Sequence, residues 1–283
     1  MVHLINSKRF WINCGMILLV LLVSLVAIVP IISIFINSFV DPFKASLLGG
    51  GAAKIIFKPF PVSIKQYYEA LFMNRETTIL FWNTVRITVP ILIGSLLVAL
   101  PSGYALAKFN FPFKRVLFFC YVLVMLLPIQ INLVGSYILF DRLDLLGKYI
   151  SVILPGVFSP FGAFLIYQFM KTVPDETMES ARIDGAGEIR ILLKIVVPQV
   201  KAGITSMLIL ILIDCWNMVE MPTTLLKDEK LFPMSVMIRF ITTTNPGIVF
   251  ASVAIFSIPL ILVFLMAQEN LTEGIGRSAI IKK

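Results

Sequence analysis

Long apolar stretches separated by short polar segments are the main pattern of this chain. Uncharged runs extend over residues 10–40, 87–107, 116–140, 149–170 and 240–268. Each has roughly 20 residues or more, which is the length a helix needs to cross a bilayer core. A sixth, shorter run over 202–213 continues past Asp214 as far as Val219. The pattern predicts six membrane-spanning helices at about 11–38, 82–107, 115–140, 149–171, 199–221 and 248–268.

Composition agrees with this pattern. Hydrophobic residues make up 58% of the 283 residues, charged residues only 14%, and the mean hydropathy is +0.94. A soluble domain has about 25% charged residues. We therefore expect an all-α integral membrane protein whose single domain covers 1–283, with polar segments at 41–80 and 172–198 outside the spans.

The distribution of charge predicts the orientation in the membrane, because Lys and Arg accumulate on the cytoplasmic side. With the N-terminus inside, the cytoplasmic segments hold 13 of the 24 basic and seven of the 16 acidic residues. Their net charge is then +6, against +2 for the outer segments. Both termini and the 172–198 loop are therefore predicted to be cytoplasmic, and 41–80 to be extracytoplasmic.

The first half of the 172–198 loop has the signals of a short helix. Pro174 suits a first helical position, and Asp175 and Glu176 follow in the first turn, where negative charge favours the helix dipole. Gly185 can take the left-handed conformation that ends a helix. These residues predict a helix over 174–184.

The second half of the loop has the periodicity of another helix. Ile189, Leu192, Leu193 and Val196 fall at i, i+3, i+4 and i+7, which predicts one apolar stripe. Pro198 is then expected to open the next membrane helix at its first position.

The loop also carries a specific motif. Glu179, Ser180 and Ala181 are followed after three residues by Gly185 and after nine more by Ile195, with Pro198 behind it. This spacing resembles the cytoplasmic EAA loop of permeases of ATP-binding-cassette (ABC) importers, with Ser180 in place of the middle alanine. The resemblance implies that the loop docks on an ATPase. The residues expected to couple the two proteins are Glu179, Ser180, Ala181, Asp184, Gly185, Ile195 and Pro198. A plain helix-turn-helix connector is the alternative.

Other segments between residues 75 and 270 resemble permeases of the carbohydrate (maltose and oligosaccharide) type. They are the sequences around Asn83, Tyr104 to Lys108, Pro128, and Trp216 with Asn217. The resemblance implies the MetI-like permease architecture, six transmembrane helices with a cytoplasmic coupling loop. It also implies four kinds of partner: a second related permease, a dimer of ATP-binding-cassette ATPases, an extracytoplasmic solute-binding protein and a sugar. The protein would reside in the bacterial plasma membrane.

Enzymatic chemistry has no visible basis in the sequence. The phosphate-binding motif G-x-x-x-x-G-K-[ST] does not occur, so ATP and Mg²⁺ are expected on the partner ATPase, with no cofactor or metal in this chain. The single histidine, His3, lies near the N-terminus. Cys14, Cys120 and Cys215 have no ligand spacing and are interpreted as buried small residues. The net charge of +8 is spread over membrane-flanking loops, which argues against nucleic acid as a partner.

Polar residues inside predicted spans are costly and commonly face a cavity or a partner helix. Gln130 and Asn132 follow Pro128 in the middle of the third predicted span, and we interpret them as candidates for the substrate pathway. Asp214, Trp216 and Asn217 lie near the outer end of the fifth. Two interpretations of these three residues are possible. They could line a vestibule in which Trp216 stacks on a sugar, or they could serve only for interfacial anchoring and helix packing, which we favour.

The sequence therefore predicts the permease subunit of a binding-protein-dependent importer for a sugar or oligosaccharide. Three alternatives stay open: a permease for another solute such as glycerol phosphate, an integral-membrane enzyme, and a secondary carrier. The last two are disfavoured, because neither a catalytic constellation nor inverted repeats with charged residues at the midplane are evident.

Overall fold

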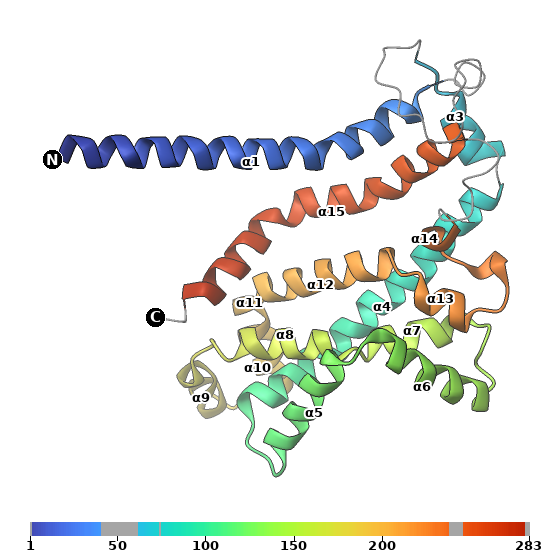
Figure 1. Cartoon of the computed structure of the whole chain (residues 1–283). Helices are drawn as coiled ribbons and strands as arrows, with labels where there is room; N and C mark the ends of the chain where they lie inside the picture. Colours follow the sequence, from blue (N-terminus) through green and yellow to red (C-terminus); the bar gives the residue numbers. More distant parts are fainter. Residues whose placement is uncertain (1, 41–61, 74, 238–245, 281–283) are drawn as a thin grey trace. The chain divides into compact units, whose positions relative to one another are not determined.

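The computed structural model describes residues 2–40, 62–73, 75–237 and 246–280, and its regular elements are helices (Figure 1). The chain divides into two compact units. One comprises residues 1–77 and 240–257, and the other comprises 78–239 and 258–283. The all-α prediction is confirmed. The single domain over 1–283 stays a prediction, and most of the predicted outer loop at 41–80 lies outside the described residues.

The first unit is built on the long helix α1 (Val2–Ser38). Its side chains from Phe10 to Ile32 are exposed, as expected for a helix surrounded by lipid. Its end packs on the short α3 (Lys65–Tyr68), which continues into the π-helical η1 (Glu69–Met73). The hydroxyls of Ser38 and Tyr67 are 2.7 Å apart, and the Gln66 amide donates to the carbonyl of Val40. These bonds fix the turn that follows α1.

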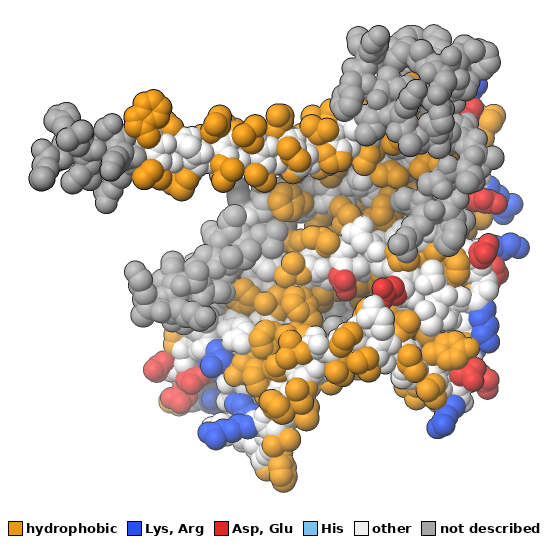
Figure 2. Space-filling model, in the orientation of Figure 1, with side chains coloured by type: hydrophobic (Ala, Val, Ile, Leu, Met, Phe, Trp, Pro, Cys, Tyr) orange, Lys and Arg blue, Asp and Glu red, His pale blue; other side chains and the backbone are white. Residues whose placement is uncertain are grey.

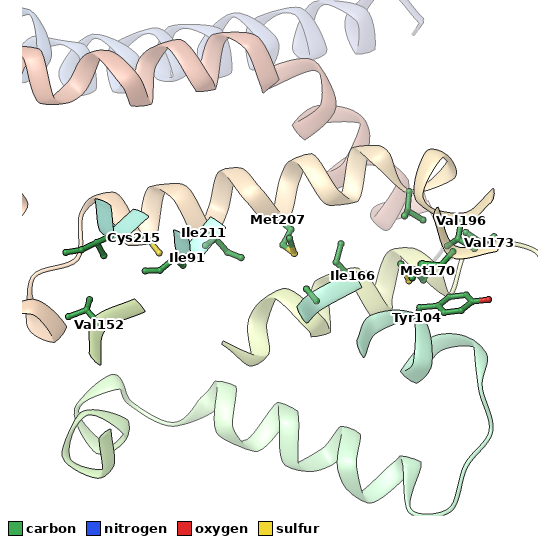
Figure 3. Close-up of a cluster of buried hydrophobic side chains, with 14 of the residues drawn as sticks. Ile91, Tyr104, Val152, Ile166, Met170, Val173, Val196, Met207, Ile211 and Cys215 are labelled. Carbon is green, nitrogen blue, oxygen red and sulfur yellow. The ribbon is translucent and has the colours of Figure 1, made fainter. Parts of the chain in front are cut away.

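The second unit is organised around α4 (Arg75–Lys108), α7 (Tyr149–Val157), α8 (Pro160–Met170) and α12 (Lys201–Trp216). Ile91, Val152, Ile166, Met207 and Ile211 from these four helices are buried in one apolar cluster (Figure 3). The unit also contains further elements. They are α5 (Lys114–Leu126), α6 (Ile129–Arg142), α9 (Asp175–Ile183), α10 (Glu188–Ile191), η2 (Leu192–Val196), α11 (Val197–Gln199), α13 (Glu220–Leu225), η3 (Glu229–Leu231) and α14 (Met234–Met237). Several of them contribute buried side chains to the core, such as Met178 of α9 and Val196 of η2.

Glycines allow two of these helices to approach α8 closely. A Cβ atom at Gly103 in α4 would lie 2.6 Å from the Ile166 side chain, and one at Gly203 in α12 would lie 2.3 Å from the Phe169 ring. Neither distance is possible for a real Cβ atom. Small residues are commonly found where membrane helices pack this tightly. The structure thus holds α4, α8 and α12 together as one tightly packed group.

In the described part of the chain, four helices are long and apolar enough to span a membrane: Phe10–Ser38, Arg75–Lys108, Tyr149–Met170 and Gly247–Met266. The last belongs to α15 (Pro246–Ile280). They lie over the spans predicted at 11–38, 82–107, 149–171 and 248–268. The other two predicted spans are not straight, because α5 and α6 meet at 103° and the 188–199 segment meets α12 at 81°. The count reaches six if each bent pair crosses the membrane once.

The bends have local causes. Pro128 stands between α5 and α6 and has an extended backbone, with φ −55° and ψ 139°. A proline lacks the N–H that would continue the preceding helix, and it also disfavours the helical conformation in the residue before it, so α5 ends here. The second bend lies at Val200, where φ is −104° and ψ is 16°. Pro198 therefore sits inside α11 and not at the first position of the membrane helix, which begins at Lys201. The prediction that Pro198 opens the membrane helix was therefore wrong, because the short helix α11 precedes that helix.

Candidate functional site

The polar loop between α8 and α12 begins with α9, which ends as the sequence predicted. Gly185 has a positive φ of 81°. Its N–H donates to the Arg182 carbonyl at 3.0 Å, and the N–H of Ala186 donates to the Ala181 carbonyl at 2.9 Å. These two bonds form a Schellman motif. The helix spans Asp175–Ile183, and Pro174 is its extended N-cap residue with ψ 136°, so the predicted helix over 174–184 is one residue shorter at each end.

The two faces of α9 have different environments. Met178 is buried, and Ala181 packs partly against the core of the unit. Glu179, Ser180 and Asp184 are exposed, and the Ser180 hydroxyl donates to the Glu176 carbonyl of its own helix. The exposed face is therefore acidic, small and open to another protein.

An ion pair joins α9 to the following helix. Arg182 Nε donates to Glu188 Oε1 at 2.7 Å, and its Nη2 lies 3.3 Å from Oε2. Arg182 is thus paired with Glu188 of α10. Within the described residues Glu179 forms no ion pair. Its carboxylate is free to contact another protein.

Two side chains from the end of α4 also reach the loop. The Tyr104 hydroxyl donates to Glu188 Oε2 at 2.7 Å, and Lys108 Nζ donates to the Val173 carbonyl at 2.5 Å and to Asp175 Oδ1 at 2.7 Å. Tyr104 and Val173 lie at the same end of the apolar cluster (Figure 3). Both halves of the loop are therefore bonded to α4.

These bonds shift the titration of the loop carboxyls. Hydrogen bonds from Arg182 and then from Tyr104 lower the pKa of Glu188 below its usual value. The Lys108 ammonium lowers the pKa of Asp175 in the same way, first by a hydrogen bond and then by its charge. Both carboxyls are thus ionised at neutral pH, as their ion pairs require.

The second half of the loop differs from the single apolar stripe predicted for it. Leu192 and Val196 are buried, but Ile189 is 75% and Leu193 is 55% exposed, and Ile191 is buried in their place. The π-helical turn η2 changes the register of the side chains, so a helix of 3.6 residues per turn does not describe them. Ile195 packs partly against the core, and Pro198 is exposed. Ile183 is 87% exposed, so the loop has three exposed large apolar side chains, Ile183, Ile189 and Leu193.

The first two pathway candidates lie at the start of α6 and are not in the middle of a continuous span. Gln130 is exposed, and its amide nitrogen lies 3.3 Å from both carboxylate oxygens of Glu220 in α13. Asn132 is partly exposed, and none of the hydrogen bonds seen among the described residues involves its side chain. The structure thus brings Gln130 to a carboxylate that the sequence did not single out.

The other three candidates have different environments. Trp216 is buried, with its ring 6.0 Å from that of Phe81 at an interplanar angle of 79°. It therefore packs inside the unit, which agrees with helix packing, the interpretation favoured above, and not with a stacking face for a sugar. Asp214 and Asn217 are exposed, and the Asn217 amide donates to the Ile213 carbonyl at 2.8 Å. Acidic side chains stand out from an otherwise apolar surface near the end of α12 (Figure 2).

Cys215 is buried, as the sequence suggested, whereas Cys14 and Cys120 are exposed. The prediction of burial was wrong for these two, because α1 and α5 present most of their side chains outward. Among the described residues there is no group of three or more His, Cys, Asp or Glu that could hold a metal ion.

Comparison with known proteins shows the family of this chain. The family model described as "Binding-protein-dependent transport system inner membrane component" matches residues 79–277. The chain belongs to this family. It is a multi-pass membrane permease, a transporter subunit and not an enzyme, as predicted.

Relatives of this permease are named after different solutes. It is 28% identical over 225 residues to the sn-glycerol-3-phosphate transport system permease protein UgpE of Brucella abortus (strain 2308), covering 75% of this chain and 79% of the relative. It is 27% identical over 228 residues to the arabinooligosaccharides transport system permease protein AraQ of Halalkalibacterium halodurans, covering 78% and 80%.

The fold of the permease matches that of a bacterial ABC transporter involved in the import of the acidic polysaccharide alginate. The TM-score is 0.79 at 23% identity, over 94% of this chain and 98% of that one. A second chain, from the alginate transporter in complex with an alginate pentasaccharide-bound periplasmic protein, has a TM-score of 0.60 at 15% identity over 93% and 94%. These similarities support the MetI-like architecture predicted for the permease.

Proposed function

We propose that this permease is one of two related membrane subunits of an ATP-driven importer for a sugar or oligosaccharide. The observation that carries the proposal is the match to the transport family over residues 79–277, together with the arabinooligosaccharide relative, which aligns over 78% of this chain. A solute-binding protein delivers the sugar from outside, and both termini and the 172–198 loop face the cytoplasm.

The loop containing α9 and α10 is the joint to an ATPase dimer. Its apolar side chains Ile183, Ile189 and Leu193 are exposed, and so are the acidic residues Glu179 and Asp184 of the same loop. Exposed apolar side chains outside the bilayer are typical of a protein contact. Ser180 and Gly185 are small and exposed, so a partner can approach the backbone closely there, whereas Ala181 packs partly against the core. ATP and Mg²⁺ bind to the ATPase, and this chain needs no cofactor.

The open polar residues Gln130, Asn132, Asp214, Asn217 and Glu220 belong to the substrate pathway. Their amides and carboxylates can exchange hydrogen bonds with sugar hydroxyls. Within the described residues neither Asp214 nor Glu220 takes part in an ion pair. Unpaired carboxylates repel an anion and accept hydrogen bonds from a neutral solute, which supports an uncharged sugar.

Glycerol phosphate is the second candidate substrate. It is supported by the name of the Brucella abortus relative. Asp214 and Glu220 disfavour it, because the negative charges of these carboxylates would repel a negatively charged phosphate.

The test is reconstitution of the permease in proteoliposomes with its second permease, its ATPase and its binding protein. ATP-dependent uptake would be measured for labelled neutral oligosaccharides and for labelled glycerol 3-phosphate. We expect uptake of a neutral oligosaccharide and stimulation of ATP hydrolysis by the loaded binding protein. Uptake of glycerol 3-phosphate alone would support the second candidate, and ATP-independent uptake of any solute would contradict the ABC mechanism.

A further inference from the structure

The end of α4 is tied to both halves of the loop between α8 and α12, and we propose that Tyr104 and Lys108 are positioning residues that make this loop a rigid extension of α4. In this arrangement a displacement of the loop by the ATPase moves α4 directly. The inference rests on the proposed docking of an ATPase on the loop. It adds the element that receives the motion and the two residues that transmit it.

Lys108 connects two helix ends. It is the last residue of α4, where a positive charge favours the C-terminal end of the helix dipole. Its partner Asp175 is the first residue of α9, where a negative charge is favoured. The side chain of Lys108 is only 5% exposed, and its ammonium bonds both to Asp175 and to the Val173 carbonyl. A nearly buried ammonium with two partners in the loop defines where α9 begins relative to α4.

Tyr104 makes a second connection one turn earlier on α4. Its ring is buried, in contact with the Phe109 ring at a centroid distance of 5.4 Å, so the hydroxyl has little freedom. That hydroxyl bonds to Glu188 in α10, and Glu188 holds Arg182 in α9. The two connections therefore attach α9 and α10 to α4 and to each other.

α4 is packed tightly against α8 in the second unit. Gly103 lies directly against Ile166 of α8, between Tyr104 and Ser102 in the same turn. Tight packing of this kind moves as a body, because close-packed interiors transmit strain with little compression. A loop held only by its two chain ends would bend when it is pushed, whereas a loop bonded at Val173, Asp175 and Glu188 is expected to carry α4 with it.

The experiment measures both the attachment and its consequence in the assembled transporter. A spin label at Thr177→Cys, on the exposed side of α9 and in a background without the three native cysteines, reports the mobility of the loop. Lys108→Met removes the ammonium, and Tyr104→Phe removes the hydroxyl while keeping the ring. We expect the label to become more mobile in both variants, and stimulation of ATP hydrolysis by loaded binding protein to fall about fivefold or more. Lys108→Arg should restore both readouts in part.

Matched controls separate the attachment from general damage and from docking. Lys171→Met and Tyr167→Phe change the same residue types beside the loop, where Lys171 lies over the Tyr167 ring at 5.7 Å, and both should behave as wild type. Docking is tested separately by measuring whether the ATPase stays bound to the permease during purification. We expect the Lys108→Met and Tyr104→Phe permeases to keep their ATPase. Wild-type mobility, or wild-type stimulation, in both variants overturns the inference while the docking proposal stands. The inference is also overturned if both variants lose the ATPase while the mobility of the label stays as in the wild type.

Discussion

At the level of single residues, Gly185 and Gly187 make different demands on the backbone. Gly185 has φ 81°, and Gly187 has φ −72°, a value that any residue adopts easily. A Cβ atom at either position would meet nothing within 4 Å. The effect of substitution at Gly185 therefore comes from its backbone conformation and not from lack of space.

Gly185→Val is predicted to distort the end of α9, because a β-branched residue with positive φ is strained by about 1–2 kcal/mol or more. The Schellman bonds to Arg182 and Ala181 would weaken, and the exposed face of α9 would be misplaced. We expect a membrane-inserted permease that loses the ATPase on purification or loses stimulation by loaded binding protein. Gly187→Ala is the matched control and should retain both. Equal behaviour of the two variants would mean that the left-handed turn has no role in docking.

The lowered pKa of Glu188 predicts how the loop responds to acid. Because its pKa is lower in the folded state, the bonds to Arg182 and Tyr104 contribute fully above the ordinary Glu value of about 4.3 and are lost as the pH falls through the lower folded value. The label at position 177 should stay immobile from pH 7 to about 5 and become mobile only below the ordinary value. Glu188→Gln should reduce the pH dependence. A rise in mobility above pH 6 would contradict this origin.

Local residues of the loop could be predicted from the sequence, but their long-range partners could not. The end of α9 follows from Gly185 itself, since few other residues accept a positive φ. Tyr104 and Lys108 stand out in the sequence only as part of a family pattern. Their bonds to Glu188 and Asp175 cross 84 and 67 positions of the chain. The sequence shows a basic residue at the end of one helix and an acidic residue at the start of another. This pattern alone could not identify Lys108 and Asp175 as partners, because the sequence contains many such pairs.

At the level of elements, the bend before α6 determines where the polar residues of that helix lie. The sequence located Pro128 but predicted a continuous span over 115–140, and the 103° bend places Gln130 in the first turn of a new helix. There it reaches Glu220, 90 positions along the chain. Periodicity predicted the helices but not the bends or the π-helical turn η2, because these depend on packing against elements distant in the sequence.

Gln130→Ala is predicted to remove the amide contact of Glu220 and to alter the pathway without disturbing assembly, since Gln130 is exposed. We expect Gln130→Ala and Asn132→Ala to change the apparent substrate affinity or the transport rate about two- to tenfold, which corresponds to the loss of one ordinary hydrogen bond. Uptake in proteoliposomes gives both values. Ser136→Ala, a partly exposed residue further along α6, serves as the control. If both variants transport like wild type, α6 has a packing role only.

For the whole molecule, the distribution of basic residues determines the predicted orientation. A cysteine introduced at Gly185 should be protected from an impermeant thiol reagent in sealed cells and become reactive after permeabilisation, in a background without native cysteines. A cysteine at Gly50, which lies outside the described residues, should react in sealed cells. The physical reason is the positive charge of the segments placed in the cytoplasm, +6 against +2 outside. External labelling at position 185 would reverse the orientation and exclude docking of a cytoplasmic ATPase.

Contact between the loop and the ATPase can be measured by photocrosslinking in the assembled transporter. A photoreactive amino acid would replace Ile183 or Ile189, two exposed apolar residues of the loop, and Ile138 on α6, which is also exposed, would serve as the control. The proposed joint predicts crosslinks to the ATPase from positions 183 and 189 and none from 138. Absence of crosslinks from both loop positions in a complex that still hydrolyses ATP on addition of loaded binding protein would contradict the assignment of this loop as the joint.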